Sequence, residues 1–368
     1  MLKTDRAFGL VPRPAGAHAH FLQQWRPVAP PDAVARTAAE RRLDMLTKPR
    51  GALGRLEPLV ARICAIQGTL SPAISQPVAI VFAADHGVAD RGVSAYPRAV
   101  TAQMVGNFLA GGAAINVLAR LHGLDLWIVD AGVDGACASH PRLLDLKLRG
   151  GTHDFVGQAA MSVEECHECL ARGRRALETA AAPGCNTVIL GEMGIGNTAA
   201  SALLTHAITG EPLAHCVGRG TGLDDAGLAR KRSVLEAALA RRAPPADPIQ
   251  LLAEFGGFEI AMLAGAVLGA AARRMLIMID GFTVTVAAAL AARIDPGVLD
   301  YCVFAHCSAE HAHRTLLEHL GAEPLLDVGM RLGEGTGAAM ALALVRDSLG
   351  LFSDMATFAG AGVSDRDS

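Results

Sequence analysis

Six short apolar runs, each followed at once by a polar residue or glycine, constrain the fold of this chain more than any other feature. Such runs are typical of strands covered on both faces, as in a parallel sheet. Long alanine-rich segments between them predict helices, so the pattern favours an α/β fold. The predicted strands are VAIVFAA (78–84), LDLWIVD (124–130), TVILGE (187–192), MLIMID (275–280), YCVFAH (301–306) and PLLDVG (324–329).

The composition agrees with that architecture. Hydrophobic residues make up 51% of the 368 residues and aromatic residues only 4%, which predicts a core of small aliphatic side chains in closely packed helices. The length allows one large and one small domain. Residues 34–67 predict helices interrupted by the turn KPRGALG, whereas residues 1–36, rich in Pro and Ala, predict a loosely held lead-in.

The charge pattern argues against large anionic partners. The formal net charge is -3 and the arginines are scattered, so we expect neither a nucleic-acid nor a membrane partner. The N-terminus lacks the apolar core of a signal peptide, and the uncharged stretch 260–272 is too short to span a bilayer. A cytoplasmic protein that binds small molecules is the expectation.

The eight cysteines are too sparse for a disulfide framework. Cys166 and Cys169 have the spacing of some metal and redox sites, but they stand in SVEECHECLARGRRALETA, which predicts a capped helix. A second cysteine pair or a preceding strand-to-helix turn is missing. An ordinary, partly buried helix is the favoured interpretation, and no metal site is predicted.

The residues that follow the predicted strands indicate where a site would lie. In a parallel sheet all strands end at the same edge, so these residues should converge on one crevice. Taken singly, such residues often only terminate loops; repeated after six strands, they predict an active site. They are Asp85-His86-Gly87, Asp130-Ala131-Gly132, Glu192-Met193-Gly194, Asp280-Gly281, His306-Cys307-Ser308 and Asp327-Val328-Gly329.

Three glycine-rich segments precede predicted helices: GEMGIGNTAASALLTHA, GRGTGLDDAGLARKRSVLEAALA and RLGEGTGAAMALALV. Backbone amides in such loops, together with the start of a helix, bind phosphates or sugar hydroxyls. Lys231 can add a full positive charge. Residues 194–199 fit G-x-G-x-x-A, half of a dinucleotide fingerprint, but the acidic strand end that should follow is missing.

Glu334 lies between Gly333 and Gly335 on flexible backbone before a predicted helix. A solvated carboxylate is the usual state of a loop glutamate, but the predicted sheet edge favours a general base here. Glu192 and Asp280 have a similar placement. His86 is interpreted either as orienting a partner or as supporting its loop.

Taken together, these segments resemble the nicotinate-nucleotide:dimethylbenzimidazole phosphoribosyltransferase family, from about residue 43 to residue 344. The matching motifs are LTKPRGALGRLE, FAADHGVADRGVSAYPRAVTAQMVGNFLAGGAAINVLAR, GEMGIGNT, GRGTGLDD with Lys231, FGGFEIAMLAGA, DGF, HCSAEHAH and RLGEGTGAA.

The resemblance implies roles for particular residues. Glu334 would be the catalytic base, with Glu192 and Asp280 organising the reacting centre. Ser94 and Gln103 would lie by the aromatic-base pocket. The residues implied around the ribose phosphate are Gly194, Gly220, Lys231 and Ser308, and the predicted binding set is completed by Asp85, His86, Gly196, Gly281 and Gly333.

The resemblance also implies a three-layer α/β/α sandwich with a mainly parallel sheet of about six strands, a small helical domain built from both chain ends, and a homodimer. The corresponding division is 1–74, 75–335 and 336–368. The implied substrates are nicotinate mononucleotide and a benzimidazole-type base, with no cofactor. The alternatives are an NAD-linked oxidoreductase, resting on the partial fingerprint, and a non-catalytic binding relative. The preferred base stays open.

Overall fold

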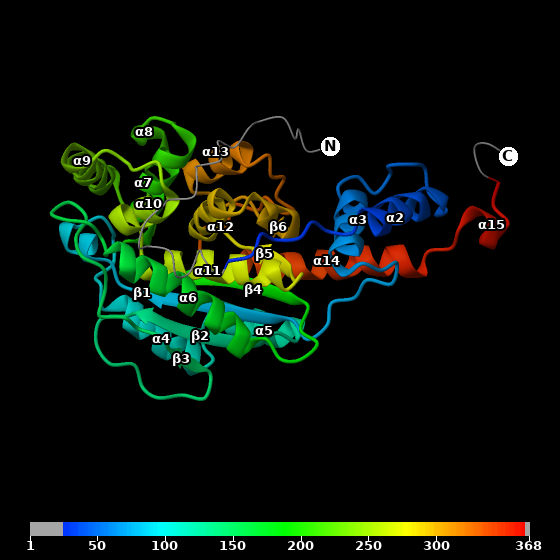
Figure 1. Cartoon of the computed structure of the whole chain (residues 1–368), viewed down its shortest axis with the longest axis horizontal. Coiled ribbons are helices and arrows are strands. Elements are labelled where there is room, and N and C mark those ends of the chain that lie inside the picture. The colour runs from blue at the N-terminus through cyan, green and yellow to red at the C-terminus, as the bar shows by residue number, and fades with distance from the viewer. Residues whose placement is uncertain (1–24, 365–368) are drawn as a thin grey trace.

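The computed structural model describes residues 25–364, which form a six-stranded parallel sheet with helices on both faces (Figure 1). The strand order is β3-β2-β1-β4-β5-β6, and every neighbouring pair is parallel. The predicted α/β fold is therefore confirmed. The strands are β1 (Val78–Ala84), β2 (Asp125–Gly132), β3 (Leu143–Asp145), β4 (Thr187–Met193), β5 (Leu276–Ile279) and β6 (Cys302–Phe304).

Two of the strand assignments differ from the prediction. The run 324–329 is not a strand, because it makes only one bridge, between Leu326 and His306, and its last three residues are exposed. Pro324 also lacks the N–H group that a ladder needs. In its place β3 supplies the sixth strand. That strand has three half-buried or exposed residues at the sheet edge, so it carries no apolar run for the sequence to reveal.

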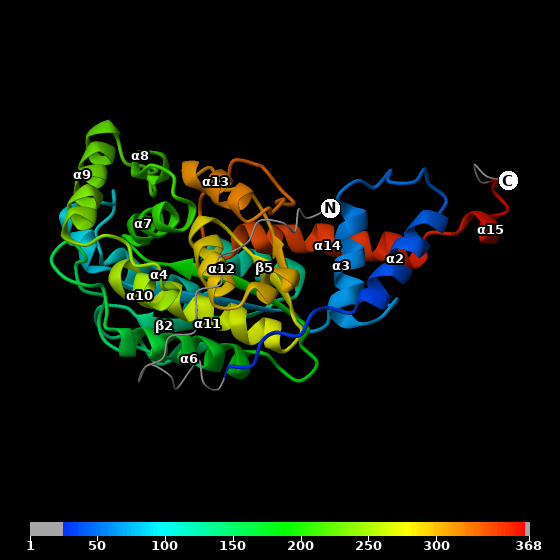
Figure 2. The same cartoon turned by 45° about the horizontal axis from the view of Figure 1, so that its top comes forward.

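The helices cover the sheet in two layers. Helices α6, α11 and α12 lie on one face, and α4, α5 and α14 lie on the other (Figures 1 and 2). The helices are α2 (Ala33–Met45), α3 (Leu56–Gln67), α4 (Val100–Leu109), α5 (Ala114–His122), α6 (Val163–Ala180), α7 (Asn197–Thr209), α8 (Leu213–Cys216), α9 (Asp225–Arg241), α10 (Pro248–Phe255), α11 (Phe258–Ala272), α12 (Phe282–Ile294), α13 (His311–His319), α14 (Thr336–Asp354) and α15 (Phe358–Ala361), with 3-10 helices η1 (Gly87–Arg91) and η2 (Pro296–Tyr301).

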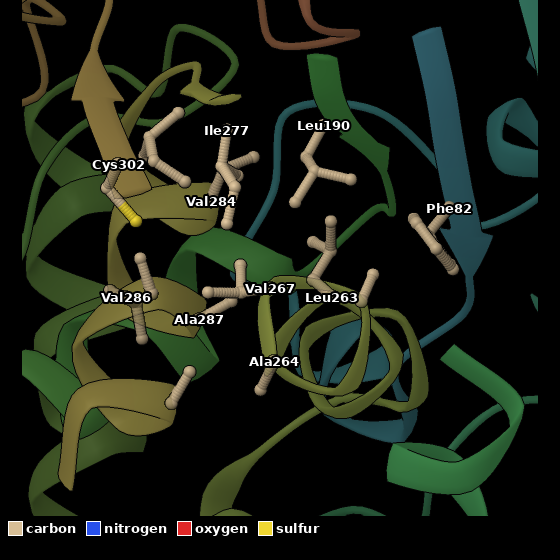
Figure 3. Packing of buried hydrophobic residues seen from close by; sticks show 14 of the residues in the cluster. Phe82, Leu190, Leu263, Ala264, Val267, Ile277, Val284, Val286, Ala287 and Cys302 are labelled. Carbon is tan, nitrogen blue, oxygen red and sulfur yellow. The ribbon is translucent and has the colours of Figure 1, made fainter. Parts of the chain in front are cut away.

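Small side chains bring these layers close together. Leu263 and Val267 of α11 pack under strand residues such as Leu190 (Figure 3). Where α11 crosses α6, a side chain on Gly173 or Gly265 would collide with the backbone of the other helix. The backbones of α6 and α11 can touch because small residues, and not aromatic ones, lie where the helices cross.

A helical unit forms from both ends of the chain. Helices α2 and α3 pack beside the end of α14, away from the sheet (Figure 1). Leu46 and Thr357 form an antiparallel bridge, and the amide of Thr47 donates to the carbonyl of Ala356 at 3.0 Å. Helix α14, which contacts β4 and β5 as well as α3, therefore runs from the sheet into this unit. The domain limits 1–74, 75–335 and 336–368 stay predictions.

The N-terminal segment 25–30 is more firmly bound than the sequence indicated. Asp295 accepts hydrogen bonds from the indole of Trp25 at 3.0 Å and from the amide of Val28 at 2.8 Å. The hydroxyl of Tyr301 donates to the carbonyl of Ala29 at 2.7 Å. The loosely held lead-in is thus a wrong prediction for these residues, while residues 1–24 lie outside the described part of the chain.

Two sequence features have ordinary structural explanations. Cys166 and Cys169 lie on α6, which begins with a capping box of Ser162 and Glu165, and burial raises the pKa of both thiols. This confirms the capped helix. The segment Val100–His122 has the length and composition of a membrane span, but it forms two separate helices, α4 and α5, and both pack on the sheet.

Candidate active site

The carboxyl edge of the sheet brings together side chains from distant parts of the sequence. Glu192 is the next-to-last residue of β4, Asp280 follows β5, and Ser308 follows β6. The glycine loop 333–335 reaches the same edge, since the amide of Glu334 donates to the carbonyl of Glu192 at 3.1 Å. Glu334 therefore lies at the strand ends, where the sequence predicts the crevice.

The backbone of Glu334 is held in an unusual conformation. Its φ is +64°, and the flanking Gly333 and Gly335 have φ values of +85° and +86°. Left-handed backbone is unfavourable for residues with a side chain. The loop also lies directly on Gly191, where a Cβ atom would stand 2.5 Å from the carbonyl oxygen of Glu334. Strand β4 can approach the loop because this position is glycine.

The carboxyl group of Glu334 is placed for proton transfer. Only 5% of the residue is exposed. Its Oε2 accepts from the amide of Ile115 at 3.3 Å, at the start of α5, and Oε1 makes no hydrogen bond to a described residue. Burial raises the pKa, the Ile115 amide opposes that shift, and the negative charge of Asp280 adds to it. A raised pKa and a free oxygen suit a general base.

Asp280 fixes the start of helix α14. Its two oxygens accept from the amides of Gly335 at 3.2 Å and Ala338 at 2.9 Å. His306 Nε2 lies 3.7 Å from Oδ1. Burial raises the pKa of this carboxyl, while His306 and the amides lower it. The sequence predicts a catalytic role for Asp280. In the structure both of its oxygens accept hydrogen bonds that position the loop carrying Glu334.

Glu192 lies beside that loop. The side-chain amide of Asn197, the first residue of α7, donates to its Oε2. Its Oε1 faces Gly333, where a Cβ atom would stand 2.6 Å away. Burial raises the pKa of Glu192 to about 8, and the charges of Asp280 and Glu259 contribute. These effects favour the protonated form of Glu192.

Lys231 supplies a buried positive charge at the other glycine loops. Its ammonium group donates to the hydroxyl of Thr198 at 2.8 Å and to the carbonyl of Gly218 at 3.2 Å. Burial lowers its pKa to about 8, against the opposing charge of Glu310. Gly220 adjoins both side chains, with its Cβ position 2.8 Å from Thr198 Oγ1. A phosphate held here would meet a cation and a helix N-terminus.

Ser308 is positioned by a neutral histidine. Its amide donates to His313 Nδ1 at 2.8 Å, so that nitrogen carries no proton. His313 Nε2 therefore donates to the hydroxyl of Thr285 at 2.9 Å. Burial lowers the pKa of His313 to about 3. Gly281, the residue before α12, lies next to Ser308 and His306, so these predicted residues share one corner of the crevice.

Four predicted binding residues have differing surroundings. Ser94 bonds through its hydroxyl to Thr221 at 3.0 Å, which joins two loops. Gln103 is exposed on α4. Asp85 accepts from the amide of Asp134 at 2.8 Å, and His86 is fully buried. The structure thus gives Asp85 and His86 supporting contacts, and their predicted role in substrate binding stays a prediction.

Sequence reasoning missed Asn197, Thr198 and Glu259. Glu259 Oε1 lies 2.5 Å from His86 Nε2, and neither residue is exposed. A signal for Glu259 was present, because it is the one charged residue of α11. Gly194 and Gly196, predicted from the motif, form the loop between Glu192 and Asn197. Among residues 25–364 there is no group of three or more side chains able to hold a metal ion.

Comparisons with known proteins agree with this arrangement. A family model described as phosphoribosyltransferase matches residues 28–363. The nicotinate-nucleotide–dimethylbenzimidazole phosphoribosyltransferase of Cupriavidus necator is 54% identical over 341 residues, which cover 93% of this chain and 99% of that protein. The protein of the same name from Dechloromonas aromatica is also 54% identical, over 92% of this chain and 98% of that protein.

Solved structures give the same result. The crystal structure of a phosphoribosyltransferase of this name from Thermus thermophilus superposes with a TM-score of 0.86 at 44% identity, covering 91% of this chain and 99% of that chain. A second structure from that organism has a TM-score of 0.87 at 45% identity. The chain belongs to the nicotinate-nucleotide–dimethylbenzimidazole phosphoribosyltransferase family.

Proposed function

We propose that this enzyme transfers the 5-phosphoribosyl group of nicotinate mononucleotide to 5,6-dimethylbenzimidazole or a related base, giving the α-riboside phosphate and nicotinate. The observation that carries the proposal is the buried carboxyl of Glu334, with one oxygen free, on the same sheet edge as a buried lysine. The names of the relatives supply the substrates. No comparison favours the NAD-linked alternative.

The chemistry needs few parts. The ring nitrogen of nicotinate mononucleotide is cationic, so the bond to the ribose C1′ breaks with its electron pair returning to the ring. The bare nitrogen of the azole forms the new bond from the opposite face, which inverts the anomeric centre. Glu334 takes the proton from the other azole nitrogen. Lys231 and the glycine loops hold the phosphate, so both reactants are aligned.

The test is direct. The purified protein is incubated with nicotinate mononucleotide and dimethylbenzimidazole, and nicotinate and riboside phosphate are measured by mass spectrometry. Equal amounts of the two products are expected. Nicotinate release that is independent of the azole, or no release, would contradict the proposal, and the latter result would favour a binding protein. Mixed azoles and purines in one assay would then rank the bases.

We further propose a homodimer that works in the cytoplasm. Apolar side chains on the outer faces of α5 and α14 support an interface with a second copy: Leu121 is 71% exposed, Val117 45% and Met340 40%. All eight cysteines are free, which suits a reducing compartment. Light scattering should give twice 38.1 kDa. A monomer at micromolar concentration would contradict the dimer.

A further inference from the structure

The buried pair of His86 and Glu259 has no part in the chemistry described above. His86 follows β1, and Glu259 lies in the first turn of α11. Their facing atoms are 2.5 Å apart and both side chains are fully buried. The outer atoms, His86 Nδ1 and Glu259 Oε2, have no hydrogen-bond partner among the described residues. Burying such a pair costs desolvation energy, and no other hydrogen bond accounts for it.

The pair lies directly under the loop that leads from β4 to α7. A Cβ atom on Gly194 would stand 2.6 Å from the carbonyl oxygen of Ala84 and 3.3 Å from Glu259 Oε1. A Cβ atom on Gly196 would stand 3.1 Å from the Cβ of His86. Since Gly194 and Gly196 contact the pair at both ends of the loop, its shape depends on both partners.

That loop in turn sets the surroundings of Glu192. It ends at Asn197, whose side-chain nitrogen donates to Oε2 of Glu192. A proton on Glu192 therefore lies on Oε1, the oxygen facing Gly333. In this form Glu192 is a hydrogen-bond donor next to the loop that carries Glu334.

Several groups from neighbouring elements act on that proton. The carboxyls of Asp280 after β5, Glu259 on α11 and Glu334 before α14 all raise the pKa of Glu192, and Asn197 on α7 lowers it. Asp280 and Glu334 have positions in the crevice. Glu259, by contrast, lies under the 194–196 loop.

We propose that His86 and Glu259 are positioning residues for the transfer reaction: together they hold the 194–196 loop against β1, so that Glu192 presents Oε1 as a hydrogen-bond donor beside the loop that carries Glu334. The inference rests on the proposed function. Glu192 in this form can donate to a ribose or azole atom without competing with Glu334 for the azole proton. Activity should then fall as rising pH removes that proton.

Glu259→Gln tests the pair, because the amide keeps the size of the side chain and removes the charge. The descending limb of kcat, measured at saturating substrates from about pH 6 to about pH 9.5, should move about one unit lower. At the alkaline end kcat should fall about tenfold. Glu254→Gln is the control, since it removes a partly buried carboxyl that pairs with Arg241, and its profile should match wild type.

Lys231 also titrates in this range, but it holds the phosphate, so its effect belongs to KM for nicotinate mononucleotide. Its opposing charge is Glu310, so Glu259→Gln should leave that KM limb in place. A kcat profile identical to that of an active wild type would overturn the inference. An inactive wild type would instead overturn the proposed function.

Glu192→Gln decides the matter if Glu259→Gln fails to fold. The amide of glutamine can accept from Asn197 and donate from the other position, as a protonated carboxyl does. The expected kcat stays within about tenfold of wild type and loses its descending limb, whereas Glu192→Ala should lose more. A fall of about a hundredfold or more in Glu192→Gln, with normal thermal unfolding, would show that the ionised form is needed and would overturn the inference.

Discussion

Lys231 is fully buried, and its ammonium group is held by Thr198 and Gly218. Replacing it with methionine keeps the volume and removes the charge, so KM for nicotinate mononucleotide should rise about 10- to 100-fold, as for the loss of a charged hydrogen bond. The pKa of Lys231, about 8, also predicts the direction of the pH dependence of KM. Above this pH the wild-type lysine loses its proton and KM rises, whereas the KM of the variant lacks this dependence. Initial rates across pH measure both.

Arg174→Met on the exposed face of α6 is the matched control, because among residues 25–364 Arg174 pairs with Glu178 of its own helix. Its KM should equal that of wild type. An unchanged KM in Lys231→Met would remove this residue from the phosphate site.

Single residues also show how far the sequence could be interpreted. Glu334 could be predicted because two glycines isolate it before a helix, and Lys231 because it follows a glycine loop. The partner of His86 could not be predicted, since Glu259 is distant in sequence and meets His86 through the packing of α11 against β1. Side-chain pairs of this kind depend on tertiary contacts that local patterns do not encode.

At the scale of elements, helix α14 connects the chemistry to the fold, because its first turn is held by Asp280. Asp280→Ala leaves two buried amides without acceptors, so the free energy of unfolding should fall by about 2–3 kcal/mol. Displacement of Glu334 should lower kcat by at least about tenfold. Urea unfolding and steady-state kinetics measure the two effects.

Asp32→Ala separates stability from positioning. Asp32 caps α2 by accepting from Val34 and Ala35, so its loss should cost about 1 kcal/mol with no change in kcat. If Asp280→Ala loses stability but keeps full kcat, the proposed positioning role of Asp280 is wrong.

Elements were predictable where burial was complete. Five of the predicted strands exist, because strands covered on both faces have continuous apolar runs such as 78–84. The run 324–329 misled because it is apolar without being fully buried, and β3 was missed because an edge strand of three residues has no such pattern. Edge pairing is decided by neighbouring strands, which a local pattern does not include.

In the molecule as a whole, hydrogen bonds to Asp295 and Tyr301 attach segment 25–30, the start of the described chain, to the large domain. Asp295→Ala removes the acceptor for Trp25 and Val28. The free energy of unfolding should fall by about 2–3 kcal/mol, since these bonds go to a charged group. Because the carboxyl edge is untouched, kcat should not change. Unaltered urea unfolding would show that this attachment adds no stability.

The overall architecture followed from the sequence because alternating strands and helices admit few parallel arrangements. The attachment of segment 25–30 did not, since its hydrogen bonds join the indole of Trp25 and the backbone of Val28 and Ala29 to side chains about 270 residues away in sequence. A segment rich in proline gives no local signal of such contacts.

The proposed reaction depends most on one step, in which the carboxylate of Glu334 takes the azole proton. The decisive measurement is kcat of Glu334→Gln at saturating nicotinate mononucleotide and dimethylbenzimidazole, with the fold checked by thermal unfolding. Glutamine keeps the size of the side chain and its contact with Ile115 but cannot accept a proton, so kcat should fall about 10²- to 10⁴-fold with KM for the nucleotide unchanged. A folded variant that turns over at the wild-type rate would show that Glu334 is not the base.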